Sequence, residues 1–221
     1  MKLTGMRVAG LLGGVLALVL LLPCVAWAQT GKHVAIGASI GNHDYADQRF
    51  HQGAGVQLLY RVAPTGAEEN GLSFGPSATL GFSRADVRDD VGGGDVPLGK
   101  LQSIPAMVGF GPHYRHGRWW TGLSVTAGAS FNNFNVDAAA RQAYEERTGV
   151  ELESVDAKTA FAVQPGASVW YDVGSRLGLY GGAAYFFSRP KVSITAGDVT
   201  TEETWKADYL GFSVGAVFGV F

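Results

Sequence analysis

The sequence predicts an all-β protein, an eight-stranded antiparallel up-and-down transmembrane β-barrel with a short helix in its third external loop. The first observation is the strict alternation of residues 119–131, where one face is apolar and the other carries small, mildly polar groups. The second is the length of that stretch, because a tilted strand that crosses a bilayer needs roughly 9–11 residues. The third is that the connections between such stretches are alternately long and short, as in membrane barrels.

Residues 1–28 have the pattern of an export signal. Two cations precede an apolar run, and the segment closes with the small-x-small triplet Ala26-Trp27-Ala28, after which signal peptidase cuts. We therefore expect a cleaved signal peptide and a single outer-membrane barrel domain over residues 29–221, in a Gram-negative bacterium. A retained transmembrane helix is the alternative, and a lipoprotein acylated at Cys24 is disfavoured by the preceding Pro23.

The composition argues against several functional classes. The chain has 32 Gly, 16% charged residues and a formal net charge of −2. Because there is no basic excess, we expect no binding to nucleic acid. The one cysteine lies in the expected signal peptide, so the mature chain has no thiol to form a disulfide. We expect no metal ion and no cofactor.

Four strands are predicted in the first half of the chain. They span residues 32–41, 54–63, 72–83 and 100–112. Residues 42–52 are polar and read as a solvated loop, and residues 64–71 carry the Pro, Gly and Asn of a turn. Residues 84–99 are predicted to form a long acidic loop. A cation site there is the weaker alternative, because the spacing lacks the order and the final glutamate of calcium loops.

Four more strands are predicted in the second half, at residues 119–131, 157–172, 177–187 and 206–221. Residues 113–118 and 173–176 are short turns, whereas residues 132–156 and 188–205 are long loops. In the first of these loops, Asp137 can cap a short helix that Gly149 ends.

The outer face of the predicted strands favours lipid over water. One face of the first, third, fifth and sixth strands carries no charged residue, and a single Arg or Lys at mid-bilayer would cost roughly 2–4 kcal/mol. A secreted sandwich or a lipocalin-like barrel would carry charges on that face. Aromatic residues near the strand ends suit two interfacial girdles, although strand propensity alone also places aromatics there. They are Tyr114, Trp119 and Tyr171 at one end and Phe82, Phe131, Phe134, Tyr185 and Trp205 at the other.

The face of small residues is predicted to line the interior, the candidate ligand-binding region. Its larger members are Gln57, Arg61, Met107, Trp120, Gln164, Trp170, Tyr180 and Phe186. The many Gly, Ser, Thr and Ala residues leave volume that eight strands would otherwise fill, which favours a narrow cavity or conduit for something uncharged. The alternative is that the aromatic side chains simply close the interior.

Catalysis is not expected. Outer-membrane hydrolases need a His, an acidic residue and a Ser in one place. His113 and His116 are predicted to lie in a turn, and the remaining histidines lie near the first loop or the N-terminus, none beside an obvious serine nucleophile.

Two prolines are candidates for a break in the barrel wall. Pro105 lies in the outer half of the fourth strand and Pro165 near the middle of the sixth. Proline has no N–H to donate to a strand ladder, so a solute could leave sideways at either position. A bulge that merely bends the barrel is the alternative.

The second half of the chain resembles the OmpW family of small outer-membrane barrels. The segments that carry the resemblance are Leu101–Pro105, Arg118–Leu123 with Gly128 and Phe131, Thr159–Tyr171 and Leu210–Gly215. The resemblance implies an eight-stranded barrel with a narrow apolar channel, associated with uptake of small hydrophobic molecules. Phe161 stands at the position of a tryptophan in the family's channel constriction, so the resemblance implies a gate at Phe161. Where the family has two consecutive prolines, this chain has only Pro105. The terminal Phe221 resembles a signal for the barrel-assembly machinery.

These observations together predict a narrow conduit for passive uptake of small hydrophobic molecules. The expected partners are outer-membrane lipid and lipopolysaccharide, the barrel-assembly machinery through Phe221, and the small hydrophobic solute. The alternative is a structural or surface-interaction barrel, for adhesion or envelope protection, without transport.

Overall fold

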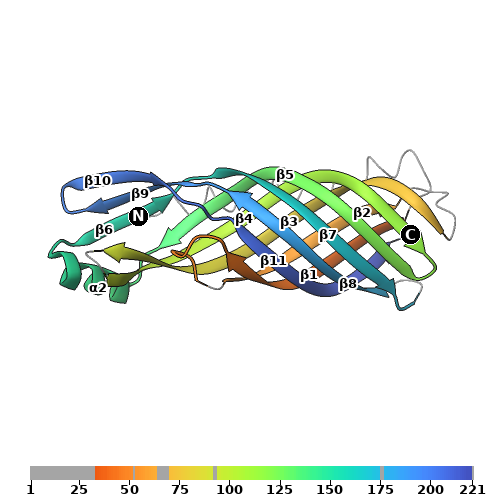
Figure 1. Ribbon diagram of the computed structural model, residues 1–221, viewed down its shortest axis with the longest axis horizontal. Helices are drawn as coiled ribbons and strands as arrows, with labels where there is room; N and C mark the ends of the chain where they lie inside the picture. Colours follow the sequence, from red (N-terminus) through yellow and green to blue (C-terminus); the bar gives the residue numbers. More distant parts are fainter. Residues whose placement is uncertain (1–32, 52, 64–69, 92–93, 175–176, 221) are drawn as a thin grey trace.

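The structure is a computed structural model that describes residues 33–51, 53–63, 70–91, 94–174 and 177–220. Eight antiparallel strands form a closed ring in the order β1-β11-β8-β7-β5-β4-β3-β2 (Figure 1), which confirms the predicted barrel. They are β1 (His33–Tyr45), β2 (Gly53–Ala63), β3 (Asn70–Val91), β4 (Gly94–His116), β5 (Trp119–Asn135), β7 (Ala160–Asp172), β8 (Leu177–Ser188) and β11 (Tyr209–Val220). The expected signal peptide and Phe221 lie outside the described residues.

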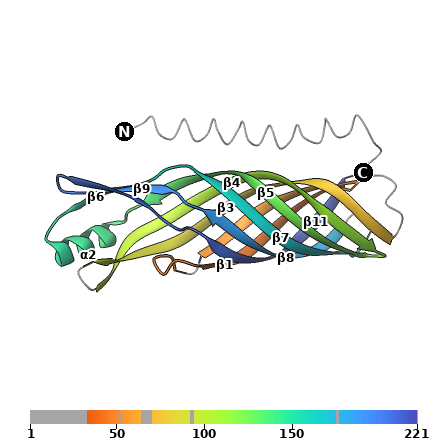
Figure 2. The ribbon, with the colours of Figure 1, turned by 45° about the horizontal axis from the view of Figure 1, so that its top comes forward.

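A second, smaller sheet lies beyond one end of the barrel. It contains β6 (Leu152–Ala157), β9 (Lys191–Ala196) and β10 (Val199–Thr204) in the order β10-β9-β6. Figures 1 and 2 show this sheet and helix α2 (Ala138–Thr148) at the same end, which we call the loop end. The opposite end, where short turns join β4 to β5 and β7 to β8, is the turn end.

Helix α2 begins and ends where the sequence predicts. The side chain of Asp137 accepts a hydrogen bond from the backbone N–H of Ala140 at 2.8 Å, which satisfies one of the free donors of the first turn. Gly149 has φ 72°, a left-handed conformation that glycine adopts without strain, and it ends the helix. Within the described ranges, no helix has the length and apolar character needed to span a membrane.

The predicted acidic loop at residues 84–99 is instead the far end of the β3–β4 hairpin. The alternation continues through it, but the apolar residues change sides. Phe82 and the even-numbered residues before it face outward, whereas beyond it Ala85 and Val87 face inward and are buried, with Arg84 and Asp86 outside. Charges outside and apolar groups inside are what a sheet in water requires, so the inversion marks the level at which the strands leave the lipid. Residues 188–205 were likewise predicted as a loop and contain β9 and β10.

The two faces of the barrel strands are oriented as the alternation predicts. On β5, the side chain of Val125 is 56% exposed on the outside, whereas Thr126 is 4% exposed on the inside. At the turn end the rings of Trp119 and Tyr171 lie 4.7 Å apart on the outer face. Two members of the predicted girdle at the loop end point inward instead: Trp205 belongs to a buried apolar cluster and Phe134 packs against it. Both residues lie above the level of inversion, where the inside is the apolar side.

Candidate functional site: the barrel interior

The interior at the loop end is filled by apolar side chains, which we call the outer cluster. It consists of Phe50, Ala85, Val87, Leu98, Leu101, Leu152, Val155, Val192, Trp205 and Ala207. These residues come from the segment after β1, from β3 and β4, from the small sheet, and from the segment before β11. Leu152 and Val192 are completely buried. The loop end is therefore closed by a packed apolar core.

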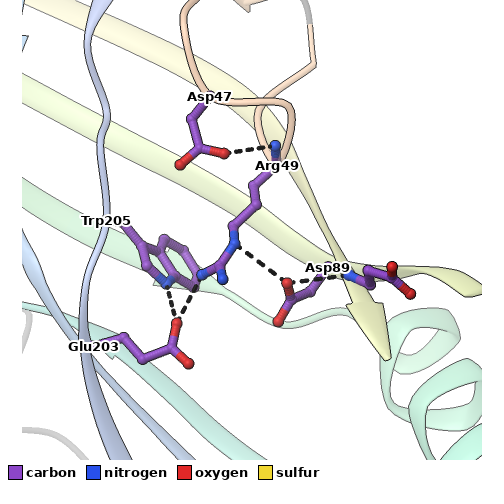
Figure 3. A network of polar contacts seen from close by, with 6 residues as sticks. Asp47, Arg49, Asp89, Glu203 and Trp205 are labelled. Carbon is purple, nitrogen blue, oxygen red and sulfur yellow. Dashed lines mark hydrogen bonds and ion pairs between the residues drawn. The ribbon is translucent and has the colours of Figure 1, made fainter. Parts of the chain in front are cut away.

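A charged network fastens three of these segments together (Figure 3). Arg49 lies between two acidic side chains, with its Nη1 2.7 Å from Glu203 Oε2 and its Nε 3.3 Å from Asp89 Oδ1. The indole N–H of Trp205 also donates to Glu203, at 3.3 Å. Backbone bonds support the network, because the N–H of Arg88 donates to the carbonyl of Arg49 at 2.8 Å. Residues 46–51 thus form a strap across the rim of the barrel.

The two acidic partners of Arg49 differ in electrostatic character. The hydrogen bond from Arg49 lowers the pKa of Glu203 below its ordinary value, so the charged carboxylate is favoured in the fold. Burial raises the pKa of Asp89, and the nearby Arg49 only partly offsets that effect. Glu203 is therefore the partner whose charge stabilises the strap.

A constriction lies directly below the outer cluster. Met107, Ala162, Phe186 and Tyr209 form it, and all four are buried. The rings of Phe186 and Tyr209 stack with centroids 4.8 Å apart, and the ring of His43 also stacks on Tyr209, with centroids 4.1 Å apart. These side chains leave no wide aqueous path along the barrel axis.

Below the constriction the interior becomes polar. It contains a cavity of about 70 Å³, which is room for a few water molecules. The polar side chains that line it are Gln57, Ser77, Thr79, His113, Ser124, Thr126, Gln164, Ser168, Trp170 and Tyr180. The hydroxyl of Thr126 donates to the backbone carbonyl of Gln164 at 3.3 Å, just below Met107. The hydroxyls and amides among the described lining side chains make this lower half unfavourable for an apolar solute.

The turn end is closed by three side chains. The indole N–H of Trp120 donates to Asp172 Oδ2 at 3.0 Å, and the guanidinium of Arg115 lies 4.7 Å from the centroid of the Trp120 ring. Arg115 Nη2 lies 3.9 Å from the same carboxylate oxygen. A charged group, its partner and a large ring therefore occupy the mouth.

The strand ladder is interrupted beside both predicted prolines. Between β3 and β4 the register runs from Leu80–Ala106 to Ser83–Ser103, and the positions between these pairs, which include Pro105, are not paired. Between β7 and β8 it runs from Val163–Phe187 to Gly166–Ala184, which leaves Pro165 unpaired with β8. A missing N–H explains both gaps.

A third interruption belongs to a proline that was not singled out from the sequence. The β4–β5 register runs from Phe110–Val125 to His113–Gly122 and skips Pro112. Pro112 lies nearer the turn end than Pro105 does.

The predicted interior residues occupy three levels of this interior. Met107 and Phe186 lie in the constriction, and Trp120 lies at the turn-end mouth. Gln57, Gln164, Trp170 and Tyr180 line the polar cavity. Arg61 belongs to β2, but its side chain is not among those described.

Two expectations are corrected. Phe161 is 71% exposed on the outer face of β7, so its ring does not reach the interior and forms no gate. His113 is buried on the inner face of β4, because this strand extends to His116 and the turn is shorter than predicted. His43 and Tyr209 are interior residues that we did not predict. His43 continues the inward parity of its strand beyond the expected end, and that parity was the available signal.

Comparison with known proteins supports the architecture. No protein-family model matches this chain, and no curated protein sequence does. The fold is similar to the crystal structure of the outer membrane protein OprG from Pseudomonas aeruginosa, with a TM-score of 0.65 and 11% identity over 86% of this chain and 97% of that chain. It is also similar to the solid-state NMR structure of the outer membrane protein AlkL in lipid bilayers, with a TM-score of 0.54 and 18% identity over 86% of this chain and 90% of that chain. Both are eight-stranded barrels of the OmpW family, so the resemblance is confirmed at the level of the fold, and the chain has the fold of an outer-membrane β-barrel of that architecture.

Proposed function

We propose that this barrel lets small hydrophobic molecules pass from outside into its apolar outer end and releases them sideways into the outer membrane. The long loops of membrane barrels face outward, so the loop end is the external one and the turn end the periplasmic one. We retain the prediction that the chain is not an enzyme.

The observation that carries the proposal is that the gap in the strand ladder of β4 lies at nearly the same height as the constriction of the interior. Four residues point inward in succession: Leu101 in the outer cluster, Ser103, Pro105 at the ladder gap, and Met107 in the constriction. The wall is therefore interrupted just above the constriction, below which the lining becomes polar. A solute that prefers the apolar side of that boundary finds a gap in the wall before it meets the hydroxyls and amides below.

The seam between β3 and β4 lacks ladder pairs at this level. The ring of Pro105 occupies the space beside Gly81, where an added Cβ would lie 3.0 Å from the proline Cγ. Neither backbone ladder bonds nor a side chain on Gly81 close the seam there. The seam between β7 and β8 at Pro165 is the second candidate exit, beside Phe186 of the constriction.

Entry from outside requires the outer cluster to open, because its members are packed together. The strap of residues 46–51 contributes to this packing, because Phe50 on the strap is part of the cluster. The ring of Phe50 stacks on Tyr45 at 5.0 Å and meets Trp205 edge-on at 5.9 Å. Outward movement of the strap exposes this apolar interior.

The second candidate function is a structural or surface-interaction barrel without transport. The same closed cluster favours it, together with the network around Arg49, since both give a rigid external surface. The two functions differ in whether any solute crosses.

The test is uptake of a hydrophobic fluorescent probe by cells with the protein, without it, and with assembled variants. Pro105→Ala restores a backbone donor at the seam, and we expect it to slow uptake several-fold. Pro112→Ala is the matched control, because it restores a donor on the same strand nearer the periplasmic end. Pro165→Ala distinguishes the two candidate seams.

Unchanged uptake when the whole protein is deleted would overturn the conduit. A simultaneous loss of surface adhesion or serum resistance would then favour the structural barrel.

A further inference from the structure

One sector of the outer face carries a group of cations directly above its aromatic belt. Strands β11, β8 and β7 run side by side there (Figures 1 and 2). The cations are Lys158, Arg189, Lys191 and Lys206, all exposed. We call them the basic group.

Backbone contacts bring these residues together from separate segments. Trp205 donates to the carbonyl of Pro190 at 3.0 Å and Ala207 to that of Ser188 at 3.1 Å, which sets Lys206 opposite Arg189. Lys191 follows two positions beyond Arg189 on the same side, and the N–H of Lys158 donates to its carbonyl at 2.9 Å.

Two of the four cations form direct ion pairs. Arg189 Nη2 lies 3.3 Å from Asp208 Oδ2, and Lys158 Nζ lies 2.7 Å from Glu202 Oε1. Among the described residues, Lys191 and Lys206 form no ion pair within 4 Å. The exposed carboxylates of Asp156, opposite Ser193, and of Asp44, opposite Leu210, also belong to this part of the surface. Among the described side chains, Lys191 and Lys206 are thus the two cations of the basic group without a direct ion pair.

Aromatic and aliphatic side chains lie on the membrane side of this group. Phe187 and Tyr185 follow Arg189 down the outer face of β8, and their rings lie 4.5 Å apart. Phe161 lies beside Arg189 in the β7–β8 register, and Leu210 lies opposite Tyr185. The exposed ring of Phe161, which does not serve as a gate, belongs to this surface.

On the opposite side of the barrel most of the cations are paired with carboxylates. Above the apolar belt of β3 and β4, Arg88 pairs with Asp95 at 2.8 Å and Lys100 with Asp86 at 3.5 Å, and the exposed Arg84 and Asp90 add one charge of each sign. The group of exposed lysines without a direct ion pair thus lies in the β7–β8–β11 sector.

We propose that this sector binds a phosphorylated glycolipid of the outer leaflet, the lipid A part of lipopolysaccharide. Its phosphates lie at the boundary between hydrocarbon and water, at the height of the basic group. Arg189 and the two unpaired lysines donate charge-assisted hydrogen bonds to them. The acyl chains lie over Phe161, Phe187 and Leu210. This site is independent of the proposed conduit, because it uses only outward-facing side chains.

The test measures the affinity of the full mature barrel in nanodiscs for bisphosphorylated lipid A and for its dephosphorylated form with the same acyl chains, by native mass spectrometry. We expect the phosphorylated form to bind at least tenfold tighter. Lys191→Gln with Lys206→Gln should remove most of that difference, about tenfold or more for two interfacial cations. Arg84→Gln with Lys100→Gln, two charges on the β3–β4 side, should change it less than twofold.

A gel shift between boiled and unboiled samples verifies that each variant is folded. Equal affinities for the two forms of lipid A, or an unaltered affinity in the Lys191→Gln and Lys206→Gln variant, would overturn the site. Phosphatidylglycerol retained as tightly as lipid A, or a soluble sulfated polysaccharide bound as tightly, would overturn the assignment to a glycolipid.

Discussion

At the scale of single residues, the face of the strand on which a residue lies determines whether its side chain must be apolar or can be polar. The outer face of β5 is apolar because it meets hydrocarbon, and the inner face is small and polar because it lines a narrow interior. Neighbouring residues one position apart therefore tolerate opposite substitutions.

A pair of arginine substitutions on β5 measures this difference. Val125→Arg places a cation in the bilayer at a cost of roughly 2–4 kcal/mol near the midplane, so assembly should be blocked. Ser124→Arg places the same cation beside the polar cavity, so a larger folded fraction is expected. The folded fraction in lipid vesicles is read from the gel shift on boiling. Similar fractions for the two variants would contradict the assignment of faces.

At the scale of elements, the strap of residues 46–51 connects two long external segments. It bonds to β3 through backbone groups and reaches Glu203 at the end of β10 through Arg49. Because the partners of Arg49 are partly exposed, each ion pair contributes less than about 1 kcal/mol. The backbone hydrogen bonds and ion pairs thus give the strap a defined position, but they are weak enough for the strap to move outward.

The two carboxylates should not contribute equally to the strap. Glu203→Gln should speed amide hydrogen exchange in residues 46–51 at neutral pH, because the fold favours the Glu203 charge. Asp89→Asn should have little effect, since burial disfavours the Asp89 charge. The reverse order of the two variants would refute this description of the network.

The same pKa directions set the pH dependence of the strap. A carboxyl with a lowered pKa stabilises the fold above its ordinary pKa and loses that contribution as pH decreases through the lowered value. In the wild type, exchange in residues 46–51 should therefore accelerate relative to other loops only below the ordinary Glu range, about pH 4. Glu203→Gln should remove this relative acceleration.

The turn-end mouth offers a separate test of the route. Trp120→Ala removes the ring that Asp172 and Arg115 hold across the mouth, but the conductance of small ions through a planar bilayer should stay low, because the constriction above it still closes the barrel axis. Uptake of a hydrophobic probe should stay unchanged, because the solute leaves above this level. Trp119→Ala, on the outer face of the same strand, is the control. Probe uptake that rises together with conductance would place the exit at the mouth instead.

At the scale of the whole molecule, the chain has two environments stacked along one axis. The barrel proper has an apolar outside and a polar inside, whereas the extension at the loop end has the reverse arrangement. One eight-stranded wall can form both environments, because side chains alternate between its two faces along the whole length. Only the residue types on the two faces are exchanged between the barrel proper and its extension.

Export can be checked directly on the intact protein. Amino-terminal sequencing of the protein from the outer-membrane fraction should begin at Gln29, after the Ala26-Trp27-Ala28 triplet. A chain that still begins with Met1, or a protein soluble in the periplasm, would contradict the prediction.

The ring of eight strands was predictable because a period of two is a local property of the sequence. The extension of β3 and β4 was equally local, since Arg84 to Arg88 alternate, but charges on the outer face were read as a loop signal. The alternation also placed Phe161 on the lipid face, and the family resemblance led to the wrong gate. The stacking of His43 on Tyr209 was not predictable, because it depends on which strands close the ring.

The central claim is that solute leaves through the seam between β3 and β4, and bridging that seam tests it most directly. Phe82→Cys on β3 and Ile104→Cys on β4 place two thiols across the ladder gap, in a mature chain that has no native cysteine. A short bifunctional thiol reagent, which a reductant can cleave, then joins the two strands. Ile40→Cys with Val56→Cys bridges an intact part of the β1–β2 ladder as the control. Hydrophobic probe uptake should drop to background in the bridged seam, return after reduction, and stay unaltered in the control. Full uptake through the bridged seam would contradict the claim.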